Sequence, residues 1–259
     1  MLNSVSSRLI LPENAVLGLA SGNKGKLREL SELTEELSLD VMNPQQLGKW
    51  LKISSARLDG APEEGVTYQQ NADIKIRSGA REIRGSEHAK RIILVGDDSG
   101  HQLFGQKWRF GTSLKDRQSI RLAGLPFPGV DTHQFEEDAM DKDVKKICAY
   151  YNELAGPGAV MLATTVIAIR PAWIPEESPS LFFEGIRYGT LAPEPRGNDG
   201  FGYDSFFIPQ GYAQTFGEMS TKMKNDLSPR RQALDKMLAA IGGRGTLDMR
   251  RRPQALSHS

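Results

Sequence analysis

The sequence predicts an α/β fold, with helices covering the faces of a mixed or parallel β-sheet. Two observations carry this prediction. The chain begins with a strand, a turn, a helix and a second strand over residues 15–44, and strand-length apolar runs then alternate with helical segments. In addition, 259 residues, 39% of them hydrophobic, are enough to bury the core of one substantial domain. Neither an internal repeat nor a long linker interrupts the chain, so we expect a single domain over 1–243.

The first elements follow from local patterns. "AVLGLA" (15–20) is a short apolar run between turn-forming residues, which is typical of a buried strand. Leucines then recur every three or four residues over 27–37 with charged residues between them, as on an amphipathic helix. Ser21 or Asn23 could cap that helix. "LDVMNP" (39–44) supplies the second strand.

Further elements are predicted along the rest of the chain. Helices are expected at 68–83, 138–154 and 228–241, and strands at 91–100, 159–169 and 182–192. The last two strands are joined by a loop that contains Pro and Ser, so we expect them to pair as antiparallel neighbours. Residues 244–259 have little to bury, and we expect them to form a disordered basic tail.

The composition excludes several classes of protein. Lys plus Arg number 33 against 32 Asp plus Glu, and this net charge of +1 lacks the basic excess of a general nucleic-acid binder. Cys148 is the single cysteine, which excludes an intramolecular disulfide, and the four histidines are not at metal-ligand spacing. No apolar stretch reaches the roughly 18 residues of a membrane helix. We therefore expect a cytoplasmic protein with no nucleic-acid or membrane partner.

The segment "SGNKGK" (21–26) lies between the first strand and the first helix. A strand that leads through a glycine-containing turn into a helix gathers backbone N–H groups and the positive end of the helix dipole, where phosphate binds readily. Lys24 and Lys26 add charge there. However, the glycines do not match the Walker pattern, and Leu27 follows Lys26 where that pattern needs Ser or Thr. By itself, the segment is explained slightly better as an ordinary capped helix with a solvated basic turn.

Two acidic segments could supply carboxylates to a site. Asp97 and Asp98 of "DDSG" (97–100) end an apolar strand, where α/β sheets bind ligands, and they point in different directions if the strand continues. One could take a metal ion or activate water, although an Asx-type turn explains the pair equally well. Glu63 or Glu64 could join Asp98 around Mg²⁺, which prefers oxygen ligands. A solvated acidic loop is the simpler interpretation of Glu63 and Glu64.

Two later segments could bind a flat or anionic ligand. "RGNDGFGYDSFF" (196–207) combines glycines with aromatic residues, so its backbone can approach a ligand, its rings can stack and Asp204 can hydrogen-bond a base. A glycine-rich hairpin with aromatic core packing is the alternative, but we favour a ligand site. Basic residues follow around a helix start at Ser228 and Pro229, either as a second anion site or as a solvated helix start. These basic residues are Lys222, Lys224, Arg230 and Arg231.

Taken in order, these segments resemble the inosine triphosphate pyrophosphatase family. The family pattern runs T/S-G-N-x-x-K, E-x-G-x-T-F-x-E-N-A-x-x-K, D-D-S-G, G-F-G-Y-D-P and K-N-x-x-S-H-R. The chain has "SGNKGK" (21–26), "EGVTYQQNADIK" (64–75), "DDSG" (97–100), "GFGYDS" (200–205) and "KNDLSPR" (224–230). Each motif is modest, but all of them in this order over residues 15–240 are highly specific.

The resemblance implies an activity, a fold and an assembly. The activity is hydrolysis of a non-canonical purine nucleoside triphosphate to the monophosphate and pyrophosphate, with Mg²⁺ as cofactor. The fold is a long twisted mixed sheet with helices on both faces, forming two lobes around a central cleft that holds the site. Members are commonly homodimers, so we expect a homodimer here.

The resemblance also assigns roles to individual residues. Asp98 would accept a proton from the attacking water or hold the metal, with Glu63 as the second metal ligand. Asp97 and Lys26 would be the other catalytic residues. Triphosphate binding is assigned to Ser21, Gly22, Asn23, Lys24, Gly25 and Lys26. Binding of the rest of the nucleotide is assigned to Ser99, Phe201, Gly202, Tyr203, Asp204, Lys224 and Arg230.

The chain departs from the family pattern at several positions. Pro229 replaces the histidine of S-H-R, Gln70 replaces the glutamate of E-N-A, and Ser205 replaces the last proline of G-F-G-Y-D-P. His101 stands where the family continues D-D-S-G with leucine. These differences indicate a diverged member. Two alternatives therefore stay open: a pyrophosphatase of a different or modified nucleotide in specialised metabolism, and a catalytically weak nucleotide-binding protein.

Overall fold

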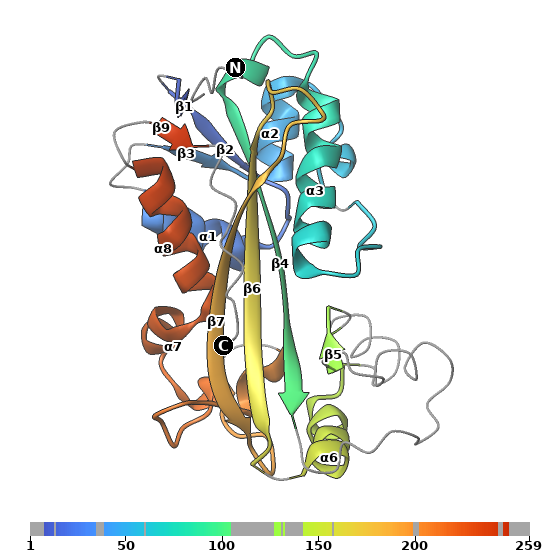
Figure 1. The fold of residues 1–259 in the computed structure, drawn as a ribbon, viewed down its shortest axis with the longest axis vertical. Coiled ribbons are helices and arrows are strands. Elements are labelled where there is room, and N and C mark those ends of the chain that lie inside the picture. Colours follow the sequence, from blue (N-terminus) through green and yellow to red (C-terminus); the bar gives the residue numbers. More distant parts are fainter. Residues whose placement is uncertain are drawn as a thin grey trace, which may run out of the picture. The chain divides into compact units, whose positions relative to one another are not determined.

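Figure 1 shows the computed structural model, which describes residues 8–12, 14–34, 39–59, 61–104, 127–130, 132, 142–156, 158–198, 202–242 and 246–248. The chain divides into two compact units. Unit 1 is Met1–Asp98, Val166–Glu184 and Ala233–Ser259, and unit 2 is Ser99–Thr165 and Gly185–Gln232. The single domain expected over 1–243 stays a prediction.

The main sheet is mixed. Its strands are β2 (Val16–Leu19), β3 (Asp40–Met42), β4 (Ile92–Phe104), β5 (Phe127–Gly129), β6 (Val160–Pro171), β7 (Leu181–Leu191) and β8 (Phe207–Pro209). Their order is β3-β2-β4-β6-β7-β8, with β5 paired to β4. β2 is parallel to β3 and β4, whereas β5 and β8 are antiparallel to β4 and β7. The predicted mixed sheet and the initial strand–helix–strand unit are confirmed.

The structure describes helices at the segments predicted as helical and at two further places. They are α1 (Lys24–Thr34), α2 (Pro44–Leu51), α3 (Tyr68–Ile83), α6 (Val144–Ala155), α7 (Thr221–Leu227) and α8 (Pro229–Gly242). Short 3₁₀ turns occur at Ser55–Arg57, Ala89–Arg91, Gly202–Ser205 and Phe216–Glu218. The helix expected at 68–83 coincides with α3. The helix expected at 138–154 corresponds to α6, and residues 138–141 lie outside the described residues.

α2 was not predicted, although the sequence contains its start signal. Asn43 accepts a hydrogen bond from the Gln46 N–H at 2.8 Å, and the Gln46 side chain accepts one from the Asn43 N–H at 2.9 Å. This reciprocal capping box, with Pro44 at the first helical position, satisfies N–H groups that a helix start leaves unpaired. The helix has only 8 residues, which is too short for periodicity to reveal it.

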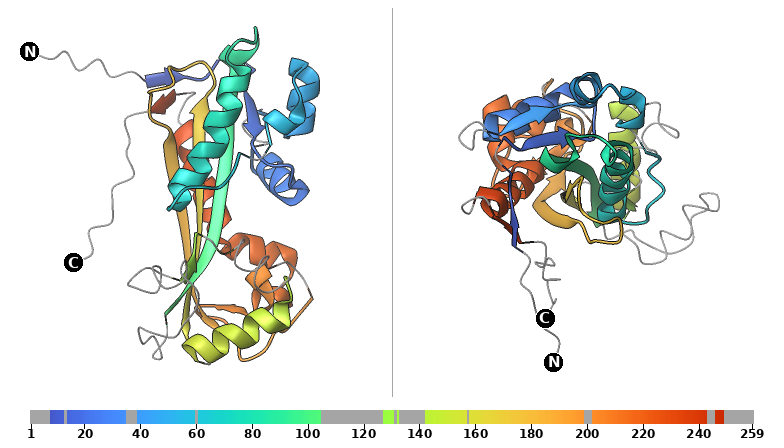
Figure 2. Two further views of the ribbon diagram at one scale, coloured as in Figure 1. Left: turned by 90° about the vertical axis from the view of Figure 1, so that its right-hand side faces the viewer. Right: turned by 90° about the horizontal axis from the view of Figure 1, so that it is seen from above.

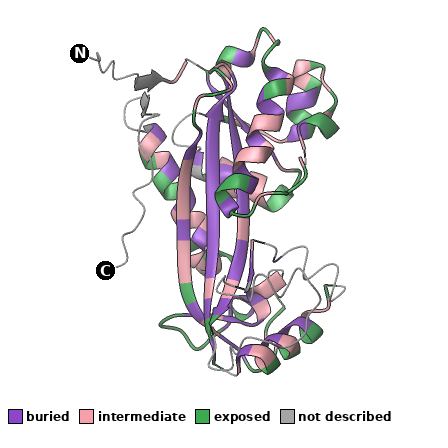
Figure 3. Ribbon diagram, turned by 45° about the vertical axis from the view of Figure 1, so that its right-hand side comes forward, coloured by how far each residue is buried: buried purple, intermediate pink, exposed green. Residues whose placement is uncertain are grey.

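In unit 1, β4 lies between α3 on one side and α1 and α8 on the other (Figure 2). Ile93 and Val95 are buried in one core with Leu30 of α1 and Leu234 of α8. The pleat of a strand sends the residues between them to the opposite face. Most of β4 is buried, as Figure 3 shows. The alternation sets the direction of each side chain that follows on β4.

α3 covers the opposite face of β4 in unit 1. A Cβ atom on Gly79 of α3 would lie 3.2 Å from Leu94 Cδ1, so this helix packs closely on the strand. The approach is closest at Gly96, where a Cβ atom would lie 2.7 Å from Ile76 Cγ2 and 2.9 Å from the carbonyl oxygen of Ala72. Gly96 therefore lets α3 rest directly on the backbone of β4.

Unit 2 has its own core, in which α6 packs against strand segments. Ile147, Cys148 and Tyr151 of α6 are buried together with Met161 of β6 and Leu191 of β7. Burial of the Cys148 thiol raises its pKa to about 11, so this cysteine is a core residue and not a nucleophile. The aromatic residues Phe206, Phe207 and Phe216 complete this core.

β6 and β7 pair as antiparallel neighbours, as the sequence predicted. The Leu191 N–H at the end of β7 donates to the Ala159 carbonyl just before β6 at 2.9 Å. The Gly158 N–H donates a hydrogen bond to the Leu191 carbonyl at 3.2 Å. The end of one strand thus meets the start of the other.

The expected disordered tail includes three residues that the structure places in a strand. β9 (Thr246–Asp248) pairs antiparallel with β1 (Arg8–Ile10), so backbone hydrogen bonding holds this segment without a large apolar surface. The rest of residues 244–259 lies outside the described residues. Within the part of the chain that the structure describes, no helix is long and apolar enough to cross a membrane.

The burial pattern along β6 gives a matched test of the core. Val166 is 0% exposed and Val160 is 46% exposed on the same strand. Val166→Ala should lower the free energy of unfolding by about 1.5–3 kcal/mol, through lost apolar burial and the cavity left behind. Val160→Ala should cost well under half of that. Urea unfolding of both variants measures the difference, and equal losses would contradict the burial assigned to β6.

Candidate active site

Asp97 and Asp98 are adjacent on β4 and project from opposite faces of the sheet. β4 continues to Phe104 without a turn, so the alternative of an Asx-type turn at this pair is wrong. Asp97 bonds Lys26 of α1, whereas Asp98 bonds Asn71 of α3. The predicted difference in direction is confirmed, and the two buried carboxylates have different surroundings.

Asp97 forms an ion pair with Lys26 near the start of α1. Lys26 Nζ lies 2.7 Å from Asp97 Oδ1, and the two side chains are 20% and 6% exposed. Partial burial makes such a pair stronger than a surface salt bridge and holds the ammonium group in one place. An ammonium group has three N–H donors, and the bond to Asp97 uses one of them.

The segment before α1 is held by its own side chains. Asn23 Oδ1 accepts from the Gly25 N–H at 2.8 Å and from the Lys26 N–H at 3.2 Å, so Asn23 caps the helix. Ser21 Oγ accepts from the Asn23 N–H at 3.3 Å. Residues 22–25 are exposed. An anion would therefore meet an exposed loop with two lysine side chains, but its cap N–H groups already have an acceptor.

A carboxylate that the sequence did not suggest lies beside this loop. The Gly22 N–H donates to Asp59 Oδ1 at 3.2 Å, across 37 positions of sequence. A Cβ atom on Gly22 would lie 2.8 Å from Asp59 Oδ2, so glycine allows the close approach. A phosphate that binds the Gly22 N–H must either displace the Asp59 carboxylate or share this N–H with it. Sharing is unfavourable because the phosphate and the carboxylate repel each other electrostatically.

Asn71 joins Asp98 to the loop that carries Glu63. Its Nδ2 donates to Asp98 Oδ2 at 3.0 Å, and its Oδ1 accepts from the Gly65 N–H at 2.8 Å. The side chain is buried, and the Gly65 bond fixes which end of the amide donates. Asn71 thus holds one oxygen of Asp98 in a set direction.

Lys75, one turn further along α3, contacts three acidic or carbonyl groups. Its Nζ lies 2.6 Å from Glu63 Oε1 and 3.9 Å from Asp98 Oδ1, and it donates to the Asp97 carbonyl at 2.9 Å. Burial alone would lower the pKa of Lys75, but the charges of Asp98, Asp97 and Glu63 outweigh it and raise the pKa. Lys75 therefore stays charged and balances the carboxylates.

Asp98 is the carboxylate best suited to accept a proton. Burial raises its pKa to about 6, with Glu63 and Asp97 acting in the same direction, against Lys75 and the Asn71 hydrogen bond. A carboxylate with this pKa is ionised at neutral pH and is a much better base than an ordinary surface aspartate.

Glu63 and Asp98, the predicted metal ligands, both contact Lys75. Among the described residues, no group of three His, Cys, Asp or Glu side chains gathers at one point. Mg²⁺ is commonly held by one or two carboxylates and completes its shell with water and substrate phosphate oxygens. The donor set therefore fits a Mg²⁺ ion that is bound together with a phosphorylated ligand, and Lys75 would share the carboxylates with it.

In unit 2, Asp204 and Lys224 form a second buried ion pair. The 3₁₀ turn Gly202–Ser205 positions Asp204, and α7 positions Lys224. Lys224 Nζ lies 2.5 Å from Asp204 Oδ2, and the side chains are 17% and 5% exposed. Gly202 has a φ of 58°, a conformation that favours glycine and allows the tight turn. The structure thus brings together two residues from separate predicted motifs.

Tyr203 on the same turn is half-buried among aromatic rings. Its ring centroid lies 5.2 Å from that of His101 and 5.7 Å from that of Phe207, with interplanar angles of 66° and 78°. Such edge-to-face contacts hold a ring in a defined orientation. The aromatic core packing considered as an alternative is therefore present, and it coexists with the Asp204–Lys224 pair.

The remaining predicted site residues have simpler surroundings. Ser99 Oγ and Thr165 Oγ1 share a hydrogen bond of 3.0 Å. The predicted start of α8 is confirmed, because Ser228 Oγ accepts from the Arg231 N–H at 3.0 Å and Pro229 is the first helical residue. Arg230 follows in that first turn. Phe201 lies outside the described residues.

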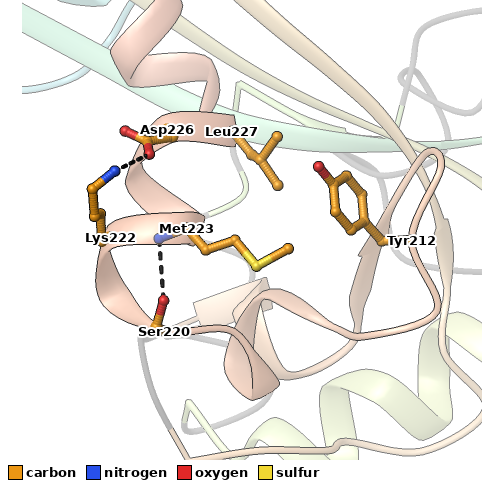
Figure 4. Close-up of a pocket in the computed structure, with 6 residues that line it drawn as sticks. All are labelled: Tyr212, Ser220, Lys222, Met223, Asp226 and Leu227. Carbon is orange, nitrogen blue, oxygen red and sulfur yellow. Dashed lines mark hydrogen bonds and ion pairs between the residues drawn. The ribbon is translucent and has the colours of Figure 1, made fainter.

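A separate open pocket of about 280 Å³ lies beside α7 in unit 2 (Figure 4). It is lined by Tyr212, Ser220, Lys222, Met223, Asp226 and Leu227. Tyr212 faces Met223 and Leu227, while Lys222 and Asp226 pair with each other at 2.8 Å on the other side of the helix. Of the basic residues considered as a second anion site, Lys222 lines this pocket.

With these clusters defined, comparison with known proteins gives the family. A model of the Ham1 family matches residues 17–105 and 113–240. The chain belongs to the Ham1 family. A dITP/XTP pyrophosphatase of Zymomonas mobilis is 33% identical over 224 residues, covering 86% of this chain and 90% of the relative. A dITP/XTP pyrophosphatase of Aquifex aeolicus is 29% identical over 234 residues, covering 86% and 95%. The predicted family resemblance is confirmed.

Solved structures agree with this assignment at the level of the fold. A HAM1 protein from Coxiella burnetii superposes with a TM-score of 0.67 and 24% identity, covering 88% of this chain and 98% of that one. The Ham1 protein of Staphylococcus aureus superposes with a TM-score of 0.63 and 20% identity, with the same coverage. The predicted α/β fold class is therefore confirmed as a Ham1 fold.

Three residues of this Ham1 protein were not predicted as site residues. Asn71 and Lys75 lie within the quoted motif "EGVTYQQNADIK", and their spacing of four on α3 places both on the face that meets Asp98. Helical periodicity applied to the motif could have found them. No local signal marks Asp59, because its partner Gly22 lies far away in sequence.

The surroundings of Asp98 predict an unusual titration. In the metal-free protein, the Asp98 carboxyl carbon should titrate by NMR with a midpoint of about 6, and Lys75→Met should raise the midpoint because a neighbouring cation is lost. Since the folded pKa exceeds the unfolded value of 3.8, this group's contribution to stability is fully present below pH 3.8 and is lost as the pH rises through about 6. Asp98→Asn identifies the signal, and a midpoint near the ordinary value of about 4 would refute the prediction.

The contact between Asp59 and Gly22 predicts that Asp59 weakens anion binding. Asp59→Asn keeps an oxygen acceptor but removes the charge, so inorganic tripolyphosphate should bind about threefold to tenfold more tightly. Asp40→Asn removes an exposed carboxylate elsewhere on unit 1 and serves as the control. Calorimetric dissociation constants measure both variants. Equal affinities for the two would show that tripolyphosphate does not approach Gly22.

Proposed function

We propose that this Ham1 protein hydrolyses a non-canonical purine nucleoside triphosphate to the monophosphate and pyrophosphate in the presence of Mg²⁺. The observation that carries the proposal is the pair of opposed carboxylates on β4, each with its own lysine. A base and fixed cations are what phosphoryl hydrolysis requires, because the protein mainly orients water and stabilises charge. The relatives named dITP/XTP pyrophosphatase support this choice of reaction and substrate class.

Phosphate binding is proposed for unit 1. Lys24 and Lys26 in the exposed segment 21–26 supply positive charge, and Asp97 keeps the Lys26 ammonium in place. Lys75 adds a third cation close to Asp98. A triphosphate carries about four negative charges, so several fixed cations lower the cost of bringing a carboxylate base near it.

Water activation is proposed for Asp98. Its carboxylate is ionised above about pH 6 and can accept a proton from water that attacks the α-phosphorus. Asn71 holds one carboxylate oxygen by a 3.0 Å hydrogen bond, so the second oxygen keeps a fixed direction. Lys75 limits the negative charge that accumulates there. Mg²⁺, held by Asp98 and Glu63, would neutralise phosphate charge and act as a Lewis acid.

Recognition of the base and sugar is proposed for unit 2 and follows from the family motifs. Tyr203 offers an aromatic ring for stacking, and the Asp204–Lys224 pair offers a carboxylate and an ammonium group with set positions. The remaining proposed contacts are Ser99, Phe201, Gly202 and Arg230. We also propose a homodimer and a cytoplasmic location on the same family resemblance.

One observation favours a second candidate, a nucleotide-binding protein with weak or no turnover. Gln70 stands in place of the family glutamate, and its Oε1 accepts from the Val66 N–H at 2.8 Å. This side chain therefore stabilises a loop and adds no carboxylate to the site. We favour the enzyme because Asp97, Asp98, Lys26 and Lys75 are all retained and paired.

A substrate panel decides between these candidates. With Mg²⁺, the protein should release pyrophosphate, and not orthophosphate, from dITP or XTP in preference to ATP. Asp98→Asn should lower kcat by roughly 100-fold or more, because the general base is lost, while dITP binding stays measurable. Asp40→Asn should leave kcat unchanged, and chelation of Mg²⁺ should abolish turnover. Binding of dITP without pyrophosphate release from any triphosphate would favour the second candidate.

A further inference from the structure

His101 lies at the centre of the aromatic cluster in unit 2. It is 0% exposed and occupies β4 three residues after Asp98. Its ring meets Tyr151 at 5.3 Å, Tyr203 at 5.2 Å and Phe206 at 6.2 Å between centroids, all at steep interplanar angles.

A hydrogen bond anchors the His101 ring within this apolar cluster. Nε2 lies 3.1 Å from the hydroxyl oxygen of Tyr151, which is also fully buried. The His101 N–H donates to Thr132 Oγ1 at 3.1 Å, so backbone and side chain are both fixed. A hydrogen bond between two buried polar groups defines the position of both rings more narrowly than apolar packing does.

His101 does not take part in proton transfer. Burial lowers its pKa to about 3, so the imidazole is neutral throughout the range in which the proposed reaction proceeds. Its influence must therefore act through packing and hydrogen bonding. Among the residues that contact the His101 ring, Tyr203 is a candidate site residue. It precedes Asp204 in the turn Gly202–Ser205.

Tyr203 receives its orientation from two sides. His101 and Phe207 contact its ring at interplanar angles of 66° and 78°, and the ring is only half-buried. A leucine in place of His101 would fill part of the space but would provide neither the aromatic edge nor the bond to Tyr151. The Tyr203 ring would then have more freedom to rotate, and a stacking partner that must first be ordered binds a base more weakly.

We propose that His101 is a positioning residue that orients Tyr203 for the nucleobase and thereby raises nucleotide affinity. This inference rests on the role of Tyr203 in the proposed function. It concerns the base end of the ligand alone, so it predicts no effect on the binding of phosphate chains without a base.

Paired variants separate this role from general packing. His101→Leu/Tyr151→Phe removes both buried polar groups and the aromatic edge, whereas His101→Phe/Tyr151→Phe removes the same polar groups and keeps the edge. The first should weaken binding of dITP and XTP about threefold to tenfold, as expected for one lost aromatic contact. The second should restore it to within about twofold of the unsubstituted protein. Both should bind inorganic tripolyphosphate as before.

Dissociation constants from calorimetry do not need turnover, so this test is independent of the proposed activity. Absence of pyrophosphate release by the unsubstituted protein would overturn the proposed function. The role of His101 would be overturned by unchanged dITP affinity in the leucine variant, or by equal losses for dITP and tripolyphosphate, which indicate a structural defect. Equal losses in the leucine and phenylalanine variants would overturn it as well.

If the double variants do not fold, NMR of the unsubstituted protein tests the role of His101 instead. In protein labelled with ¹⁵N-histidine, the His101 imidazole should stay neutral near pH 5, because burial lowers its pKa to about 3. Its ring resonances should shift when dITP is added and should not move with tripolyphosphate. An unchanged His101 signal in saturating dITP would contradict the proposal.

Discussion

The alternation of side chains along β4 sends two adjacent carboxylates to opposite faces of a sheet, and the helices on those faces meet them with one lysine each. Asp97 and Lys26 form one pair, and Asp98 and Lys75 form the other. Burying either carboxylate alone would cost several kcal/mol, roughly the penalty of an unpaired buried charge. The positions of α1 and α3 are therefore tied to β4 by charge as well as by apolar packing.

This arrangement separates two roles that the dipeptide alone could not distinguish. Asp97 holds a cation, whereas Asp98 has a raised pKa because burial outweighs its nearby cation. The strand therefore makes two chemically identical neighbours different, by giving them different surroundings.

Much of the fold and part of the candidate site could be predicted from local patterns. The leucine spacing located α1, the periodicity of 68–83 located α3, and Pro229 after Ser228 located the start of α8. The family motifs pointed to Asp98, Asp204 and Lys224, but not to Asn71 and Lys75, the partners of Asp98. Those partners depend on which face of a helix meets a distant strand or turn, and the contact of Asp59 with Gly22 spans two loops. Such contacts are set by tertiary packing, which one sequence does not reveal.

Gly96 shows how an uncharged residue can control the acidity of another. Because it has no side chain, α3 rests on the strand two residues before Asp98, and Asn71 and Lys75 reach the carboxylate from there. A larger residue at this position would move the helix outward and carry both partners with it. The pKa of Asp98 would then change although every titratable residue stayed the same. The spacing between a helix and a strand is thus a variable by which evolution or design can tune a general base.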